Sequence, residues 1–398
     1  MITTLKPRVL QWARRRAGLD YEALAKKVLG KKADPDEVKE WERTGKLTFH
    51  HAELLAAKTH TPFGYLFLDE PPKEELPIND FRTPRGAGIQ KPSPDLLDVL
   101  YQCQRRQSWY REYLISTRTE PPDFVGRFSV NDSVERTAKD ISDRLKIGSQ
   151  LSTEIQSWRE NLTSHFEAAE DVGILVMRSG IVGNNVYRKL SRDEFQGFAL
   201  SDDYAPLVFI NTRDAQAAQL FTFVHELAHI WIGVSAVSKP VRTYAETNQA
   251  ERYCNQIAAE VLIPLTEIQR EWRSTADPES EIRRIAVQYK VSTLVASRRA
   301  LDGGFINRNE FRHFYEAEVA RYMRSRPKGS VDEGGGNFYN SLKARAGDRF
   351  SRALIASTLE GKTPYKEAFR LLDLANTKSF EGFARARFGY LLNEIPAR

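Results

Sequence analysis

The central stretch of the chain reads Phe221-Thr-Phe-Val-His-Glu-Leu-Ala-His-Ile-Trp-Ile-Gly233. Its apolar residues cover nearly every side of a helix, which predicts a buried helix that ends at the glycine. His225 and His229 are four residues apart, so their imidazoles project from one face, and Glu226 projects beside them. This is the H-E-x-x-H arrangement, in which two neutral imidazoles hold Zn²⁺ and the carboxylate takes a proton from the bound water.

Chance is a poor explanation for this pattern. The chain has seven histidines, and residue frequencies put a chance occurrence at about one in a hundred. Two histidines and a glutamate on a buried helix would also be costly without a partner such as a metal ion. We therefore predict that His225 and His229 are metal ligands and that Glu226 is the catalytic base.

A catalytic zinc ion needs a third protein ligand and one open position for water. The next helical segment, residues 248–264, offers three candidates. Glu251 lies on one stripe with Asn255 and is the ligand that we predict. Glu260, on a different face, is the rival, although an exposed helix carboxylate is its ordinary role. Cys254 could bind as a thiolate, but a single cysteine in an apolar stripe is more often a small core residue.

Three runs of sequence together resemble the ImmA/IrrE family of metallo-endopeptidases. They are Val208-Phe-Ile-Asn211, the stretch from Phe221 to Ile230, and Glu251-x-x-Cys-Asn255-x-Ile-Ala-Ala-Glu-Val-Leu-Ile-Pro264. The family typically has Glu-x-x-Ala-Asn-x-Phe-Ala-Ala-x-Leu-Leu-Met-Pro in the last run, so the differences here are packing changes that leave the ligands intact. The resemblance covers about residues 165 to 300.

The resemblance implies a zinc site and a protein substrate. The implied ligands are His225, His229 and Glu251, with Glu226 as the general base. The implied substrate is often a helix-turn-helix repressor encoded nearby, so that cleavage would switch transcription. Tyr244 and Tyr253 are candidates for stabilising the oxyanion, and the motif fixes neither of them.

Short β-type runs before the metal helix predict a small antiparallel sheet. They cover residues 173–177, 197–201 and 207–211 and are bounded by Gly, Asp and Pro. The chain is therefore expected to be a mostly helical α+β protein, and the resemblance implies a zincin-like protease domain over 165–277. An exposed edge strand of such a sheet could pair with an extended peptide and lay its scissile bond across the zinc.

Residues 1–70 resemble an Xre-type helix-turn-helix bundle, whose third helix normally enters the major groove. Here that helix carries a set of charged residues that is mainly acidic: Asp34, Asp36, Glu37, Glu40 and Glu42 against Lys39 and Arg43. Such a surface repels phosphate. A module that docks on the protease or on a protein partner is at least as good an interpretation, and no DNA-binding residue is assigned.

Four further segments complete the expected organisation. Pro71-Pro72, Gly86 and Gly88 predict a linker over 71–94, and a helical connecting region follows over 95–164. A second helix-turn-helix-like element, N-capped at Ser292, is predicted over 278–325. It is the better electrostatic candidate for DNA, although a packed helix pair is the more common outcome. A C-terminal helical domain without obvious chemistry is expected over 337–398.

Composition narrows the class of protein. The net charge of +6 permits contact with nucleic acid without proving it. Two cysteines, Cys103 and Cys254, make no disulfide framework, which predicts a reducing cytoplasm. The start of the chain lacks the apolar region of a signal peptide, and no apolar run has membrane-spanning length. We expect a cytoplasmic protein without membrane contact, and a homo-oligomer is compatible with the sequence.

The function that we predict is zinc-dependent cleavage of a protein partner, such as a transcriptional repressor, in a regulatory, stress or mobile-element switch. An antitoxin or DNA-binding autoregulator is the alternative. Relatives with this long layout can sit beside a PIN-type ribonuclease toxin, and the zinc site would then be structural. The identity of the partner, a repressor or a toxin, separates the two classes.

Overall fold

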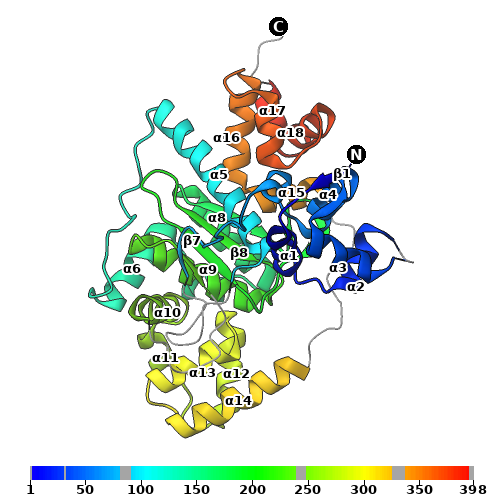
Figure 1. Cartoon of the computed structure of the whole chain (residues 1–398). Helices are drawn as coiled ribbons and strands as arrows, with labels where there is room; N and C mark the ends of the chain where they lie inside the picture. The colour runs from blue at the N-terminus through cyan, green and yellow to red at the C-terminus, as the bar shows by residue number, and fades with distance from the viewer. Residues whose placement is uncertain (1, 31–32, 81–90, 239–247, 325–336, 394–398) are drawn as a thin grey trace. The chain divides into compact units, whose positions relative to one another are not determined.

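The computed structural model describes residues 2–30, 33–80, 91–238, 248–324 and 337–393 (Figure 1). The chain divides into two compact units. One consists of Met1–Pro77 with Ile89–Leu100, and the other of Ile78–Gly88 with Tyr101–Arg398. Part of the expected linker, residues 81–90, lies outside the described residues.

The first unit is a small helical bundle. Its elements are β1 (Ile2–Thr4), α1 (Pro7–Arg16), α2 (Tyr21–Val28), α3 (Pro35–Thr44), β2 (Lys46–Thr48), α4 (Phe49–Thr59) and the 3₁₀ helix η1 (Phe63–Phe67). The strands β1 and β2 pair antiparallel. The core is apolar, but it includes a buried ion pair in which Arg14 Nε and Nη2 donate to the Glu42 carboxylate at 2.6 and 3.1 Å.

The acidic character expected of the third helix is visible in its side chains. On α3, Lys39 Nζ donates to Asp36 Oδ1 at 2.6 Å, and Arg43 donates to both oxygens of Glu40. Both basic residues of this helix are thus paired with carboxylates one turn away. This arrangement leaves α3 with excess negative charge, which does not favour contact with phosphate.

The second unit contains a five-stranded sheet in the order β3-β9-β7-β8-β4. Its strands are β3 (Asn79–Asp80), β4 (Leu175–Ser179), β7 (Gly197–Leu200), β8 (Leu207–Asn211) and β9 (Ala236–Ser238). A separate hairpin of β5 (Ile181–Val182) and β6 (Asn185–Lys189) follows β4. The expectation of a mostly helical α+β protein is confirmed.

The sheet is mixed, whereas a purely antiparallel sheet was expected. β7 is antiparallel to β8 and β9, but β4 is parallel to β8 and β3 is parallel to β9. The reason is the order of the chain: after β4 it makes the β5–β6 hairpin and then β7, and β8 inserts between β4 and β7. All residues of β8 are buried, and such a run does not reveal the direction of its neighbours.

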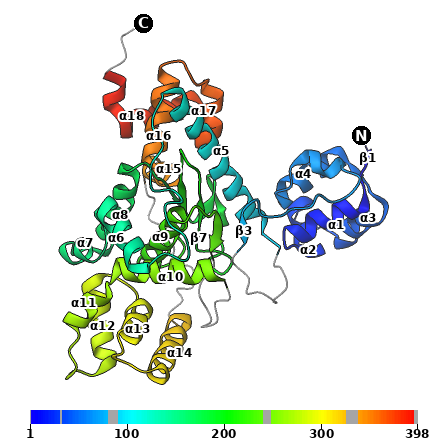
Figure 2. The ribbon, with the colours of Figure 1, turned by 90° about the vertical axis from the view of Figure 1, so that its left-hand side faces the viewer.

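The other helices follow in chain order. They are α5 (Pro94–Ser116), α6 (Val134–Leu145), α7 (Ser149–Glu154), α8 (Trp158–Asp171), α9 (Gln216–Trp231), α10 (Gln249–Leu262), α11 (Leu265–Glu271), α12 (Pro278–Tyr289), α13 (Thr293–Asp302), α14 (Arg308–Arg324), α15 (Phe338–Ala346), α16 (Asp348–Leu359), α17 (Tyr365–Leu372) and α18 (Thr377–Asn393). α9 packs on β7 and β8 and, on another side, against α10 (Figure 2). These elements enclose the main apolar core.

The C-terminal helices, drawn in orange and red in Figure 1, are bound to α5 by a buried arginine. Arg106 Nε donates to the carbonyl oxygen of Leu371 at 2.8 Å, and its Nη1 donates to that of Arg345 at 2.7 Å. α15 and α16 also contact β4. At Gly347, between these helices, an added Cβ would lie 2.9 Å from the Val176 carbonyl oxygen. The C-terminal helices therefore cover the β4 edge of the sheet.

The segment for which a second helix-turn-helix-like element was predicted contains the helices α12 and α13, and Ser292 is the N-cap of α13. Its basic side chains are engaged within the protein by carboxylates or carbonyl oxygens: Arg283 with Glu318, Arg284 with Glu281, Lys290 with Ser152, Arg298 with Asp302 and Arg299 with Glu260. This pattern supports a packed helix pair. Among the described helices, none combines the length and apolar character needed to cross a bilayer.

Candidate metal centre

The candidate site is formed by α9 and α10, which run side by side. α9 is apolar on almost all sides and has Leu220, Phe223 and Leu227 in the core. α10 begins at its N-cap Asn248, whose side chain accepts a hydrogen bond from Ala250 N. Burial of both helices brings the few polar residues on their facing sides together, and these residues are the ones singled out in the sequence.

The three predicted ligands converge on one point. Nε2 of His229 lies 3.0 Å from Glu251 Oε1, and Nε2 of His225 lies 3.4 Å from Glu251 Oε2. The two Nε2 atoms are 3.1 Å apart. Two ligand atoms bound to the same tetrahedral zinc ion lie about 3.3 Å apart, because each is ~2.0–2.1 Å from the metal. The donor atoms are therefore spaced as a zinc site requires.

The protonation states also suit a cation. Burial lowers the pKa of His229, which favours the neutral imidazole that a metal ion needs. Burial alone would raise the pKa of Glu251, but the neighbouring His225 and His229 reverse this and hold it well below its usual range. The site thus combines a neutral nitrogen donor at His229 with an anionic oxygen donor at Glu251, a set of donors that suits zinc and other divalent transition metals.

Glu226 is completely buried beside this group. Within the described part of the chain, neither of its carboxylate oxygens has a hydrogen-bond partner. Burial raises the pKa of Glu226 to about 8, and a divalent cation nearby would act in the opposite direction. A buried carboxylate without a hydrogen-bond partner lowers the stability of the fold. Its presence here therefore points to a functional role, such as contact with a water molecule beside a metal ion.

Asn255 orients the first imidazole. Its Oδ1 lies 2.9 Å from His225 Nδ1, one helical turn beyond Glu251 on α10. An amide oxygen only accepts, so Nδ1 carries the proton and Nε2 is left with a lone pair toward the metal position. The sequence placed Asn255 on the stripe of Glu251 but gave it no role, because its partner is 30 positions away in the chain.

Gly197 on β7 makes room for the Glu226 carboxylate. A Cβ at this position would lie 3.2 Å from Glu226 Oε1 and 2.8 Å from both the Phe209 carbonyl oxygen and Thr222 Cγ2. Only a residue without a side chain lets the strand pass so close to the buried carboxylate. The sequence analysis missed this residue, although a glycine inside a strand is a known sign of close approach.

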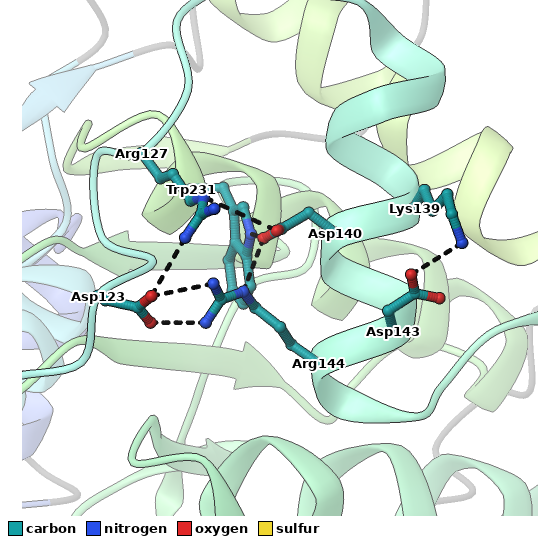
Figure 3. Close-up of polar contacts among 7 residues, drawn as sticks. All are labelled: Asp123, Arg127, Lys139, Asp140, Asp143, Arg144 and Trp231. Carbon is teal, nitrogen blue, oxygen red and sulfur yellow. Dashed lines mark hydrogen bonds and ion pairs between the residues drawn. The ribbon is translucent and has the colours of Figure 1, made fainter.

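The end of α9 is held by α6 and by the segment before it (Figure 3). Asp140 Oδ2 accepts from Trp231 Nε1 at 2.8 Å and from Arg144 Nε at 3.0 Å, while both oxygens of Asp123 accept from Arg144. Phe124 stacks on the Trp231 ring with centroids 4.4 Å apart. The main-chain N–H groups of Gly126 and Phe128 also donate to the Ile230 and Trp231 carbonyl oxygens at the end of the helix, each at 3.0 Å.

The rival ligands are used elsewhere. Glu260 is paired with Arg299 and accepts from Leu265 N at the start of α11. Cys254 is fully buried in the apolar core. Across the described residues, His225, His229 and Glu251 form the one group of three or more potential metal ligands.

The two tyrosines considered for the oxyanion have different outcomes. The Tyr253 hydroxyl shares a hydrogen bond with Thr137 Oγ1 at 2.8 Å, and this contact joins α10 to α6. It therefore serves packing between these helices. Tyr244 lies outside the described residues.

Comparison with known protein families agrees with this geometry. Residues 169–301 match the IrrE N-terminal-like domain, Peptidase_M78, and residues 346–386 match a domain of unknown function, DUF8813. Neither match covers residues 1–70, so the helix-turn-helix interpretation of that region stays a prediction. No curated protein matches the chain. The chain thus contains an IrrE N-terminal-like domain of a peptidase family, and the buried His225, His229 and Glu251 lie within it.

Proposed function

We propose that this chain is a zinc-dependent endopeptidase that cleaves a protein partner. The observation that carries the proposal is the buried, unpartnered carboxylate of Glu226 beside three side chains whose donor atoms lie 3.0–3.4 Å from one another. The residues fit a zinc ion, because two imidazoles and one carboxylate are a common catalytic donor set that leaves one position open.

Each side chain has a defined task in this mechanism. His225, His229 and Glu251 would hold the ion, and Asn255 keeps His225 in the required tautomer. When bound, zinc would polarise the substrate carbonyl and acidify a water molecule. Glu226 takes the proton from that water on a carboxylate oxygen and later gives it to the leaving amine. Its burial keeps the proton from being exchanged with bulk solvent.

A structural zinc site, as in the antitoxin alternative, fits these observations less well. Structural sites almost always have four protein ligands, and three are grouped here among the described residues. A structural site also does not explain why a fourth polar side chain, Glu226, is buried without a partner, since such burial lowers the stability of the fold. We therefore favour catalysis, with a repressor-like protein as the proposed substrate and a toxin partner as the alternative.

The proposal is tested by separating zinc binding from cleavage. Glu226→Gln should keep one zinc per chain and lose cleavage of the co-expressed neighbouring gene product, because the amide cannot take the proton. Glu251→Gln should weaken zinc binding, while Glu260→Gln on the same helix should leave it unchanged. Metal content by elemental analysis and product mapping by mass spectrometry give the two readouts. Cleavage at the normal rate by the Glu226→Gln variant would rule out this mechanism.

A further inference from the structure

The strands β7 and β9 present small residues toward α9. Gly197 of β7 lies opposite Ser238 of β9, and two residues further along Ala199 lies opposite Ala236. Residues two apart on a strand share a face of the sheet, and all four of these residues are buried. A Cβ at Gly197 would lie 3.2 Å from Glu226 Oε1, so the shared face is the one toward α9. Ser238 has the one polar side chain among the four.

The register of these strands brings Ser238 close to Glu226. Opposite residues of an antiparallel pair project to the same face, with their Cβ atoms about 4.5–5.5 Å apart. The Cβ of Ser238 therefore lies one such spacing from the point where a Cβ of Gly197 would stand, and that point is 3.2 Å from Glu226 Oε1. Because Gly197 has no side chain, no side chain of β7 at this register separates the serine hydroxyl from the carboxylate.

Both polar groups are buried, and both lack a hydrogen bond. Ser238 is 5% exposed and Glu226 is 0% exposed. Within the described residues, neither Ser238 Oγ nor either carboxylate oxygen of Glu226 has a partner in hydrogen-bond geometry. Burial raises the pKa of Glu226, and the Ser238 hydroxyl is among the nearby groups that lower it. A hydroxyl can donate and a carboxylate accepts, so each of these groups offers what the other lacks.

We propose that Ser238 positions the catalytic base: its hydroxyl donates a hydrogen bond to one oxygen of the Glu226 carboxylate and leaves the other oxygen to take the proton from water. Rotation about the Cα–Cβ bond of serine, which has three staggered settings, directs the hydroxyl to the carboxylate. Ser238 thus acts through Glu226 and is a positioning residue. The inference rests on the proposed peptidase function for the purpose of this contact, but the contact itself can be measured without turnover.

Two simpler roles for Ser238 lead to different results. If the position needed only a small side chain next to α9, alanine would replace serine without effect. If the hydroxyl stabilised the fold through another group, its loss would lower the stability of the protein whether or not the Glu226 carboxylate was present. A hydrogen bond to Glu226 is distinguished from both, because it makes the effect of Ser238→Ala depend on that carboxylate.

The first test is the kinetics of the zinc-loaded Ser238→Ala variant on the purified product of the neighbouring gene. We expect kcat to fall by about ten- to a hundred-fold, while KM and zinc content stay unchanged, because the lost contact acts on the transition state. Ser351→Ala is the matched control: this serine of α16 is also buried, and its Oγ also lacks a hydrogen-bond partner among the described residues. An unchanged kcat in Ser238→Ala, or an equal loss in Ser351→Ala, overturns the proposal.

The second test measures the contact by thermal unfolding of the zinc-loaded protein. With Glu226 present, Ser238→Ala should lower the melting temperature by about 2–4 °C, the shift expected for one lost hydrogen bond. In a Glu226→Met background, which removes the acceptor, the same change should not lower it; Glu226→Ala is a second background of this kind.

Equal shifts with and without the carboxylate overturn the proposal. If the two backgrounds differ but the parent protein does not cleave the gene product, the contact between Ser238 and Glu226 is supported while the proposed cleavage is contradicted. The two ideas can therefore fail separately.

Discussion

Replacement of Gly197 by alanine should uncouple catalysis from zinc binding. Carbon makes its closest comfortable contacts at about 3.5 Å. An alanine Cβ at 2.8 Å from the Phe209 carbonyl oxygen and 3.2 Å from Glu226 Oε1 is therefore too close by about 0.7 and about 0.3 Å. The Phe209 oxygen belongs to the paired strand β8 and cannot easily move, so the strand and the carboxylate must shift instead.

The expected effects follow from these two contacts. Overpacking of this kind typically costs ~1–3 kcal/mol of stability. A displacement of the base by several tenths of an ångström should lower kcat by about ten- to a hundred-fold, since a 1 Å misplacement can cost on the order of 10²-fold. The three atoms nearest to the added Cβ belong to Phe209, Thr222 and Glu226 and to none of the proposed ligands, so zinc content should stay at the wild-type level.

The assay is cleavage kinetics on the identified substrate, with zinc content and thermal unfolding measured on the same samples. Gly389→Ala is the control, because a Cβ there meets no atom of the described residues within 4 Å, and it should leave kcat unchanged. A Gly197→Ala protein with wild-type kcat and wild-type stability would refute the argument that this glycine makes room for the base. Loss of zinc together with activity would also refute it, since the effect would then be on the metal ligands.

Three further predictions concern the surroundings of the site. Asn255→Ala should weaken zinc binding by roughly 10–100-fold, measured by chelator competition, and Asn255→Asp should restore most of it by accepting from His225 again; equal affinity of all three proteins would contradict the orienting role. Asp140→Ala should lower the free energy of unfolding by ~1–3 kcal/mol because it leaves the buried Trp231 N–H without its acceptor, and an unchanged melting temperature would contradict this. Burial raises the pKa of Glu170 to about 7, so its ionised form costs stability as the pH rises from its unfolded value near 4.5 through 7. Glu170→Gln should therefore raise the melting temperature at pH 8 and have little effect at pH 5, and an equal effect at both values would argue against this cause.

Sequence patterns within single helices predicted the residues of the candidate site that lie close together in the chain. His225, Glu226 and His229 follow from helical spacing within five residues, and Glu251 follows from the next amphipathic helix. The strands at 197–201 and 207–211 were also predicted nearly to the residue, because β-branched and aromatic residues between turn signals mark them.

Features that depend on distant pairing were not predictable. β3 pairs with β9, in which Ala236 is opposite Asn79. No residue near position 79 indicates that partner. Trp231 meets Asp140 across 91 positions. The direction of β4 relative to β8 was wrong for a related reason: a strand buried on both faces has no alternation that would report its neighbours. Gly197 has a role only because Glu226 approaches it from another element.

The burial of Arg106 sets a limit on how this protein can be divided for experiments. Two of its acceptors are carbonyl oxygens from residues 345 and 371, beyond the end of the matched peptidase domain at 301. A fragment that keeps α5 but ends at residue 301 would leave the buried Arg106 guanidinium without these two acceptors and would expose β4 to other chains. Such a fragment should precipitate on expression, whereas one that retains everything through α18 should stay in solution.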